Sequence, residues 1–252
     1  MPVVRSDVKP VEAALRAAIQ RHGPVGFDVL VDVALYHPGG GFYVAGGRAG
    51  RSGDFITSPE VGPLFGALVA RALDGWWVEA GEPEVFTVIE AGAGPGTLAR
   101  TVLHAQPACR RALRYVLVEA AATQRATHRD RLRLEDAATA FAEVSEPDDE
   151  GRPRLPVPAG PIVVSMERLP RTQGPCVVLA NELLDNLPFR LAERVAGGWA
   201  EVRVGVDGAA LSEVLVPLER SEASWLDARA PDAIPGARVP MQRAAAAWLR
   251  DA

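Results

Sequence analysis

One stretch of this chain, residues 84–119, constrains its fold more than any other. It opens with an apolar run rich in β-branched side chains, residues 85–89, which predicts a buried strand. A glycine-rich turn follows, then a helix over residues 98–104 that Thr97 can cap, and then a second strand over residues 115–118. This order of strand, glycine turn, helix and strand is typical of the βαβ unit that binds nucleosides at the carboxyl ends of its strands.

The spacing of the glycines distinguishes between nucleoside cofactors. Gly92, Gly94 and Gly96 are spaced G-x-G-x-G, whereas a dinucleotide site uses G-x-G-x-x-G to bring backbone N–H groups against a pyrophosphate. No Gly-Lys-Ser/Thr follows the turn, which excludes a P-loop. S-adenosylmethionine (SAM) has no phosphate, so its methionine arm needs only a turn without side chains.

Two acids flank this turn where SAM would need them. The ammonium group of SAM and its ribose hydroxyls both call for carboxylates. Glu90 precedes the glycines and Glu119 ends the second strand, so the sequence predicts that they make these two contacts. The alternative is that the glycines only allow tight helix–strand packing and that both glutamates are solvated.

The composition of the chain is that of a soluble globular protein. Its 252 residues carry a formal net charge of −5, which argues against nucleic-acid binding because that needs a basic face. Cys109, Cys176 and the four histidines show no ligand spacing, so we expect neither a disulfide framework nor a metal site. The sequence has no membrane-spanning apolar stretch and no signal-peptide pattern at its N-terminus, so we expect a cytoplasmic protein without membrane contact.

Outside this βαβ unit, the sequence predicts helices in the N-terminal part and antiparallel strands in the C-terminal part. Residues 1–80 read as a helical lead, which includes a helix that starts at Pro59 and carries the apolar residues Val61, Leu64, Phe65, Leu68, Val69 and Leu73. Period-two alternation over residues 189–218 predicts an antiparallel hairpin or meander. The other expected elements are helices over residues 11–21, 27–35, 122–133 and 240–251, a polar segment over 143–154, and strands over 161–165 and 176–180.

Four motifs in this chain, taken together, resemble the MidA-type methyltransferases, a family that includes a mitochondrial complex I assembly factor and bacterial relatives. The motifs lie in residues 34–43, 53–60, 90–97 and 180–188. The resemblance implies an α/β fold, a class I SAM-methyltransferase Rossmann-like sheet with a helical N-terminal lead and a β-hairpin insertion. The domain division that we expect is 1–80 for the lead, 81–188 for the SAM-binding core, 189–218 for the hairpin insertion and 219–252 for a linker and helix.

The resemblance also implies a function, because the mitochondrial member of the family is known as a protein arginine methyltransferase. The cofactor would be SAM and the substrate a protein. Thr97, after the glycine turn, would also be among the cofactor-binding residues. The loop with Asp54, Thr57, Ser58 and Pro59 would fold over the cofactor and exclude water.

A guanidinium substrate is always protonated, so it needs acids that accept its N–H groups and fix one nitrogen at the methyl group. Glu182 and Asp185, with the adjacent Asn181, follow the expected strand over residues 176–180, where the methyl group would point. Their other interpretation is structural, with Glu182 as a helix N-terminal acid and Asp185 as a cap.

Two alternative functions remain open. A NAD(P)-dependent oxidoreductase would use the same βαβ unit, although the glycine spacing counts against it. A catalytically inactive SAM-binding assembly factor would keep the turn and lose the chemistry. Family members continue past Trp248 into further strands that are missing from this sequence, so we expect an exposed sheet edge and either self-association or a partner chain.

Overall fold

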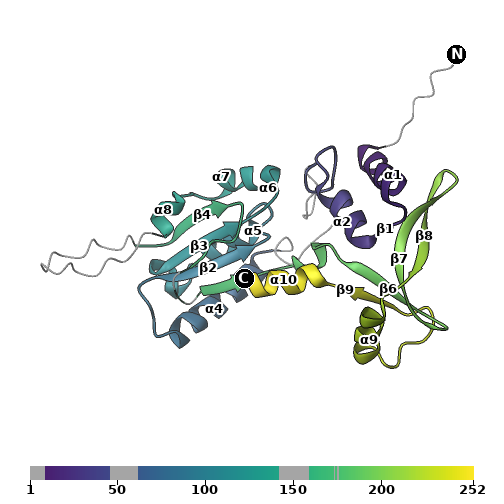
Figure 1. The fold of residues 1–252 in the computed structure, drawn as a ribbon. Coiled ribbons are helices and arrows are strands. Elements are labelled where there is room, and N and C mark those ends of the chain that lie inside the picture. The colour runs from purple at the N-terminus through teal and green to yellow at the C-terminus, as the bar shows by residue number, and fades with distance from the viewer. Residues whose placement is uncertain (1–8, 46–61, 142–158, 173, 175) are drawn as a thin grey trace, which may run out of the picture. The chain divides into compact units, whose positions relative to one another are not determined.

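The computed structural model of the chain describes residues 9–45, 62–141, 159–172, 174 and 176–252. The contacts divide the chain into two compact units, one formed by residues 46–183 and the other by residues 1–45 together with 184–252. The first unit contains a four-stranded parallel sheet and the second a five-stranded antiparallel sheet (Figure 1).

The parallel unit is the predicted nucleoside-binding core. Its strands follow the spatial order β4-β3-β2-β5, and Glu90 near the end of β2 pairs with Leu117 on β3 and Leu179 on β5. Because the strands are parallel, their carboxyl ends meet at one edge of the sheet, which is where open α/β sheets bind ligands. The strands are β2 (Phe86–Ala91), β3 (Leu113–Val118), β4 (Ile162–Met166) and β5 (Cys176–Leu179).

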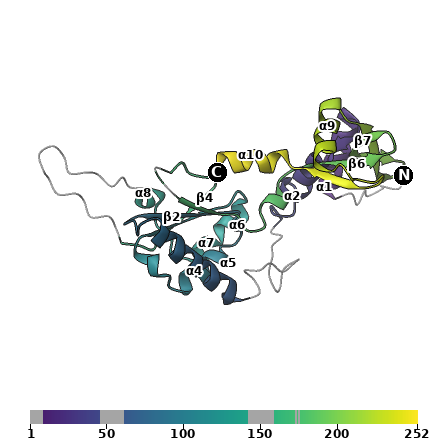
Figure 2. The ribbon, with the colours of Figure 1, turned by 90° about the horizontal axis from the view of Figure 1, so that it is seen from below.

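Apolar packing covers both faces of this sheet, as expected for parallel strands. One core lies between the sheet and two helices, α4 and α5, and includes Leu73, Val102 and Tyr115 (Figure 2). A second core on the opposite face includes Val116 and Val164. The helices of the unit are α4 (Pro63–Glu79), α5 (Thr97–His104), α6 (Ala122–Ala126), α7 (His128–Arg131) and α8 (Ala137–Ala140), with a 3₁₀ turn η1 (Ala108–Arg111).

The apolar residues expected on α4 divide between the core and the surface. Leu73 is fully buried and Phe65 and Val69 pack against the same core, whereas Leu64 and Leu68 are 72% and 58% exposed. The helix also buries Gly66, where an added Cβ would lie 2.2 Å from Oγ1 of Thr101 on α5, so the two helices approach too closely for a larger residue. This close approach of small residues orients α4 so that Leu64 and Leu68 lie outside the core.

Two further predictions concern the helix over residues 122–133 and the start of α4. The helix expected over residues 122–133 is two short helices, α6 and α7, that meet at Thr127. The Thr127 hydroxyl donates to the Gln124 carbonyl at 2.8 Å, and such a local bond competes with the helical pattern. The described α4 begins at Pro63, and the start predicted at Pro59 lies outside the described residues, as does the polar segment 143–154.

The second unit confirms the antiparallel meander predicted over residues 189–218 and extends it. Strand β7 pairs with β6, β8 and β1, and β6 also pairs with β9. Pro240, which was expected to start the last helix, lies in β9 opposite Leu191 of β6. The edge position of β9 accommodates a proline, and the helix begins later. The elements are α1 (Pro10–His22), β1 (Val25–Gly26), α2 (Phe27–Tyr36), η2 (Leu184–Asn186), β6 (Arg190–Val195), β7 (Gly198–Asp207), β8 (Ala210–Pro217), α9 (Arg220–Arg229), β9 (Arg238–Met241) and α10 (Arg243–Asp251).

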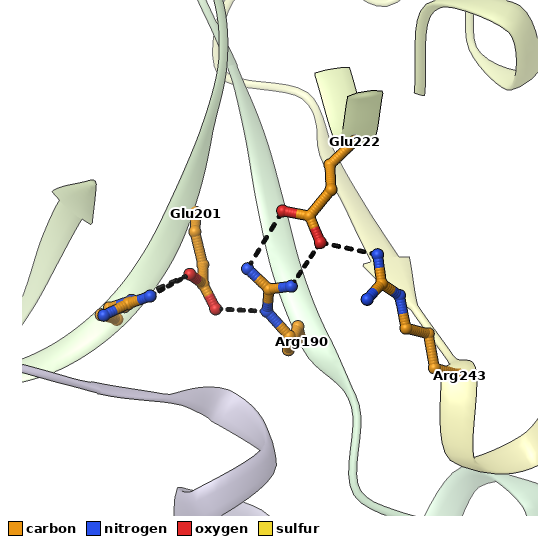
Figure 3. A network of polar contacts seen from close by, with 5 residues as sticks. Arg190, Glu201, Glu222 and Arg243 are labelled. Atoms are coloured by element: carbon orange, nitrogen blue, oxygen red, sulfur yellow. Dashed lines mark hydrogen bonds and ion pairs between the residues drawn. The ribbon is translucent and has the colours of Figure 1, made fainter. Parts of the chain in front are cut away.

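A network of ion pairs links four elements of this unit (Figure 3). Arg190 of β6 contacts Glu201 of β7 at 2.7 Å and Glu222 of α9 at 2.6 Å. Glu222 also contacts Arg243 at the start of α10, at 2.6 Å. The network therefore ties both helices to the antiparallel sheet.

The grouping of segments differs from the four-part division expected from the sequence. Strand β1, from the N-terminal lead, and β9, from the expected C-terminal linker, both pair with the meander. The meander is thus the centre of a unit built from both ends of the chain, because only these outer segments complete its sheet.

Candidate functional site

The glycine turn after β2 has a backbone that favours glycine at each expected position. Gly92, Gly94 and Gly96 have φ values of 69°, 53° and 79°, which lie in the left-handed region. A Cβ at Gly96 would lie 3.2 Å from Leu117 and 3.3 Å from His128, so Gly96 is also constrained by packing. A Cβ at Gly94 would meet no described atom within 4 Å. The Gly94 backbone can therefore be approached closely by a ligand.

Thr97 does not cap helix α5, contrary to prediction. The helix begins at Thr97 itself, after Gly96 in the left-handed conformation, and the structure shows no side-chain cap. Because the left-handed glycine turns the chain directly into the helix, Thr97 becomes its first residue. Its buried hydroxyl instead accepts a hydrogen bond from Nη1 of Arg131 at 3.0 Å.

Glu119 lies at the carboxyl end of β3 and is held by backbone N–H groups. The N–H of Gly94 donates to Oε2 at 2.8 Å and the N–H of Ala121 donates to Oε1 at 2.7 Å. Burial raises the pKa of Glu119, against the opposing effect of these two N–H groups and of the Arg125 charge. Each carboxylate oxygen keeps a second lone pair, so Glu119 can still accept from two ribose hydroxyls.

Glu90 is buried, with only 4% of its surface exposed. The hydroxyl of Tyr115 on β3 donates to its Oε2 at 2.7 Å. Burial raises the pKa of Glu90 to about 7, although the Tyr115 hydrogen bond acts in the opposite direction. This burial removes the alternative in which Glu90 is solvated, and it leaves a carboxyl group that a nearby cation would stabilise in its ionised form.

His128 is the residue of the site that sequence reasoning missed. It is fully buried, with Nε2 2.8 Å from the Gly94 carbonyl oxygen and Nδ1 2.8 Å from Oγ of Ser165. His128 falls in a charged stretch of the sequence and has no neighbour at metal-ligand spacing. Its partners are 34 and 37 positions away in the chain, so no local pattern could identify them.

The three predicted catalytic residues follow β5. Glu182 is exposed and has a φ of 52°, which is strained for a residue with a side chain and is found preferentially at functional positions. Leu183 packs against the glycine turn, since a Cβ at Gly92 would lie 2.9 Å from its Cδ1. Asn181 and Glu182 therefore belong to a segment beside the cofactor turn.

Asp185 belongs to a different unit from Asn181 and Glu182. It lies in η2, and the boundary between the two units falls between Leu183 and Leu184. The catalytic roles of Asn181, Glu182 and Asp185 stay predictions. Asp54, Thr57, Ser58 and Pro59 lie outside the described residues.

Metal-binding and membrane-spanning features were not among the features of the described residues. These residues contain no group of three or more His, Cys, Asp or Glu side chains that could hold a metal ion. In the part of the chain that the structure describes, no helix combines the length and apolar character needed to span a membrane.

A family model described as "Putative S-adenosyl-L-methionine-dependent methyltransferase" matches residues 68–252, which is most of the chain. The chain belongs to this methyltransferase family. The expected class I fold and the expected cofactor of the family, SAM, are thereby confirmed.

Relatives and solved structures agree with membership of this family. The chain is 32% identical over 217 residues to the Drosophila melanogaster protein arginine methyltransferase NDUFAF7 homolog, mitochondrial, covering 82% of this chain and 48% of that protein. It is 29% identical over 225 residues to the mouse protein arginine methyltransferase NDUFAF7, covering 86% of this chain and 51% of that protein. A crystal structure from Burkholderia thailandensis bound to S-adenosyl-homocysteine matches with a TM-score of 0.71 and 30% identity, over 99% of this chain and 61% of that one.

Two points follow from these comparisons. The chain spans about half the length of the curated relatives that it matches. The expectation of a cytoplasmic protein is overturned, because these curated relatives are named as mitochondrial.

Proposed function

We propose that this chain is a methyltransferase that carries the methyl group of SAM to a side-chain nitrogen of a protein, with arginine as the acceptor. The observation that carries the proposal is the turn after β2, where Gly94 is open to a ligand and Glu119 accepts the Gly94 N–H. Arginine as the acceptor is supported by the names of the curated relatives.

The residues of the turn fit the chemical groups of SAM. The open space over Gly94 admits the methionine arm, and Glu119 offers two acceptor oxygens to the ribose. Glu90, buried beside Tyr115, offers a carboxylate to a positively charged ammonium group. When bound, SAM supplies an activated methyl group on a sulfonium.

In methyl transfer, the residues of this chain would align the acceptor nitrogen with the methyl group. A guanidinium nitrogen must approach the methyl carbon in line with the bond that breaks, and the acceptor then loses one proton. Carboxylates fix a guanidinium by accepting its N–H groups in pairs. We assign this work to Glu182 and Asp185, with Asn181 as a neighbouring amide.

Cofactor binding is tested first, by calorimetric titration with SAM. Gly94→Val should abolish measurable binding because its two methyl groups would occupy the open space over the turn. Gly81→Val is the matched control, since Gly81 also has a positive φ, 83°, and also has no described atom within 4 Å of an added Cβ. Both variants carry backbone strain, so equal affinity for SAM in the two would contradict the assigned site.

Methyl transfer is tested with labelled SAM and an arginine-containing protein mixture. Glu182→Gln should keep SAM affinity and lower transfer by about 100-fold, the order of loss expected when a group that aligns reactants is removed. Mass spectrometry of the product identifies the methylated residue. A chain that binds SAM but labels no protein would indicate the inactive assembly factor instead.

A further inference from the structure

His128 is a fully buried polar side chain that joins the glycine turn after β2 to strand β4. Its ring lies between the Gly94 carbonyl of the turn and the Ser165 hydroxyl on β4, at 2.8 Å from each. The Cδ2 atom of the same ring lies 3.3 Å from the position that a Cβ at Gly96 would take. The imidazole therefore packs directly against the turn and also bonds to it.

The partners of the ring determine its tautomer. A carbonyl oxygen can only accept, so Nε2 must carry the proton and donate it to Gly94. In the neutral ring, Nδ1 is then an acceptor, and the Ser165 hydroxyl donates to it. Burial lowers the pKa of His128, which favours this neutral form.

The Gly94 carbonyl belongs to a peptide bond that has no N–H group. The next residue is Pro95, which has no N–H, so the carbonyl is the only hydrogen-bonding group of the Gly94–Pro95 peptide. Gly94 is thus held at both ends, by Glu119 at its N–H and by His128 at its carbonyl. These two bonds restrict φ and ψ of the residue whose open backbone faces the expected ligand.

Other side chains of the α6–α7 segment bind around the same turn. Arg125 donates to the carbonyl of Glu119 at 2.6 Å, and Arg131 donates to the Thr97 hydroxyl at 3.0 Å. The segment therefore touches the start of α5, the glycine turn and the end of β3, with His128 at its centre.

We propose that His128 is a positioning residue for SAM, which holds the Gly94 peptide in the binding conformation through its Nε2–H donor. This inference rests on the proposed function, because it assumes that the turn binds SAM. It assigns no contact between His128 and the cofactor.

The test compares two substitutions of similar size. In His128→Gln the side-chain amide nitrogen can replace Nε2–H as donor to Gly94, whereas His128→Leu fills the space without a donor. We expect His128→Leu to weaken SAM binding about 10-fold, the loss of one hydrogen bond, and His128→Gln to stay within about 3-fold of the natural chain. Equal affinity in the two variants would overturn the proposal, because a purely packing role does not distinguish them.

A second measurement separates this inference from the proposed function. Ring ¹⁵N NMR shifts of the natural chain at pH 7 should show a neutral imidazole protonated on Nε2, and any other state would overturn the proposal. Amide exchange at Gly96, relative to β3, should accelerate in His128→Leu and not in His128→Gln, and equal exchange would also overturn it. If the natural chain did not bind SAM, the proposed function would fail, and these two readouts would still decide whether the Nε2–H of His128 holds the Gly94 peptide.

Discussion

The burial of one residue, Glu90, makes the stability of the fold depend on pH. Burial raises its pKa from 4.5 to about 7, so between these pH values the folded protein binds more protons than the unfolded chain. The free energy of unfolding therefore falls as the pH rises through this window. The stabilisation is greatest below about pH 4.5 and is lost above about pH 7.

Replacing Glu90 by glutamine should remove this dependence. The amide is neutral at every pH and its oxygen can still accept from the Tyr115 hydroxyl. Near pH 5 the variant should be about as stable as the natural chain, and at pH 8 it should be more stable, on the order of 3 kcal/mol from the shift in pKa. Urea denaturation at the two pH values measures this, and an equal effect at both would show that Glu90 does not titrate in this range.

Glu119 gives a second prediction at this scale. Glu119→Ala removes a charged acceptor for the ribose and also the partner of the Gly94 N–H. A charge-assisted contact of this kind contributes about 1.5–3 kcal/mol, so SAM affinity should fall about 10- to 100-fold. Calorimetry with Glu135→Ala as a control checks it, since Glu135 is partly exposed and pairs with Arg133. An unchanged dissociation constant in Glu119→Ala would remove Glu119 from the site.

At the scale of elements, the ion-pair network of Figure 3 holds α9 and α10 to the antiparallel sheet. The Glu201 side chain is 3% exposed and contacts both Arg190 and Arg203. A buried carboxylate with two charged partners differs from a surface pair, because its loss removes an acceptor from both arginines, although Arg190 keeps its contact with Glu222.

Two glutamate substitutions on neighbouring strands test this difference. Glu201→Ala should destabilise the fold by about 1.5–3 kcal/mol, the range for hydrogen bonds to charged groups. Glu213→Ala breaks the more exposed pair with Arg238 and should cost less than about 1 kcal/mol. Thermal or urea unfolding measures both, and similar costs for the two would mean that burial of Glu201 adds nothing.

At the scale of the whole molecule, the parallel sheet has an edge that the described residues leave without a further strand. Strand β5 pairs only with β2 among the described strands, and its residues are half-buried. Apolar edges favour pairing with another chain. The exposed Leu64 and Leu68 of α4 add a second apolar surface in the same unit.

We therefore predict self-association of the isolated chain. Light scattering at low micromolar concentration should give a mass above that of the 26.8 kDa monomer. Substituting both exposed leucines of α4 by glutamate should lower association if that helix contributes, and should leave it unchanged if the β5 edge is responsible. A stable monomer that melts in one cooperative transition would contradict the prediction.

The sequence alone determined the features of this protein that depend on short-range pattern. Apolar runs of β-branched residues identified β2, β3, β4 and β5, and period-two alternation identified the meander. The glycine spacing with Glu90 and Glu119 identified the cofactor turn, because its requirements fall on residues that are close in the chain or at the tips of predicted strands.

The tertiary structure decided what depends on residues far apart in sequence. Burial raised the pKa of Glu90, and close packing against Thr101 placed Gly66 of α4 in the core while Leu64 stayed exposed. Pairing with β6 made Pro240 part of a strand. His128 entered the site for the same reason. Its donor meets the Gly94 carbonyl because β2 and β3 lie side by side, and a hydrogen bond between residues 34 positions apart produces no periodic pattern in the sequence.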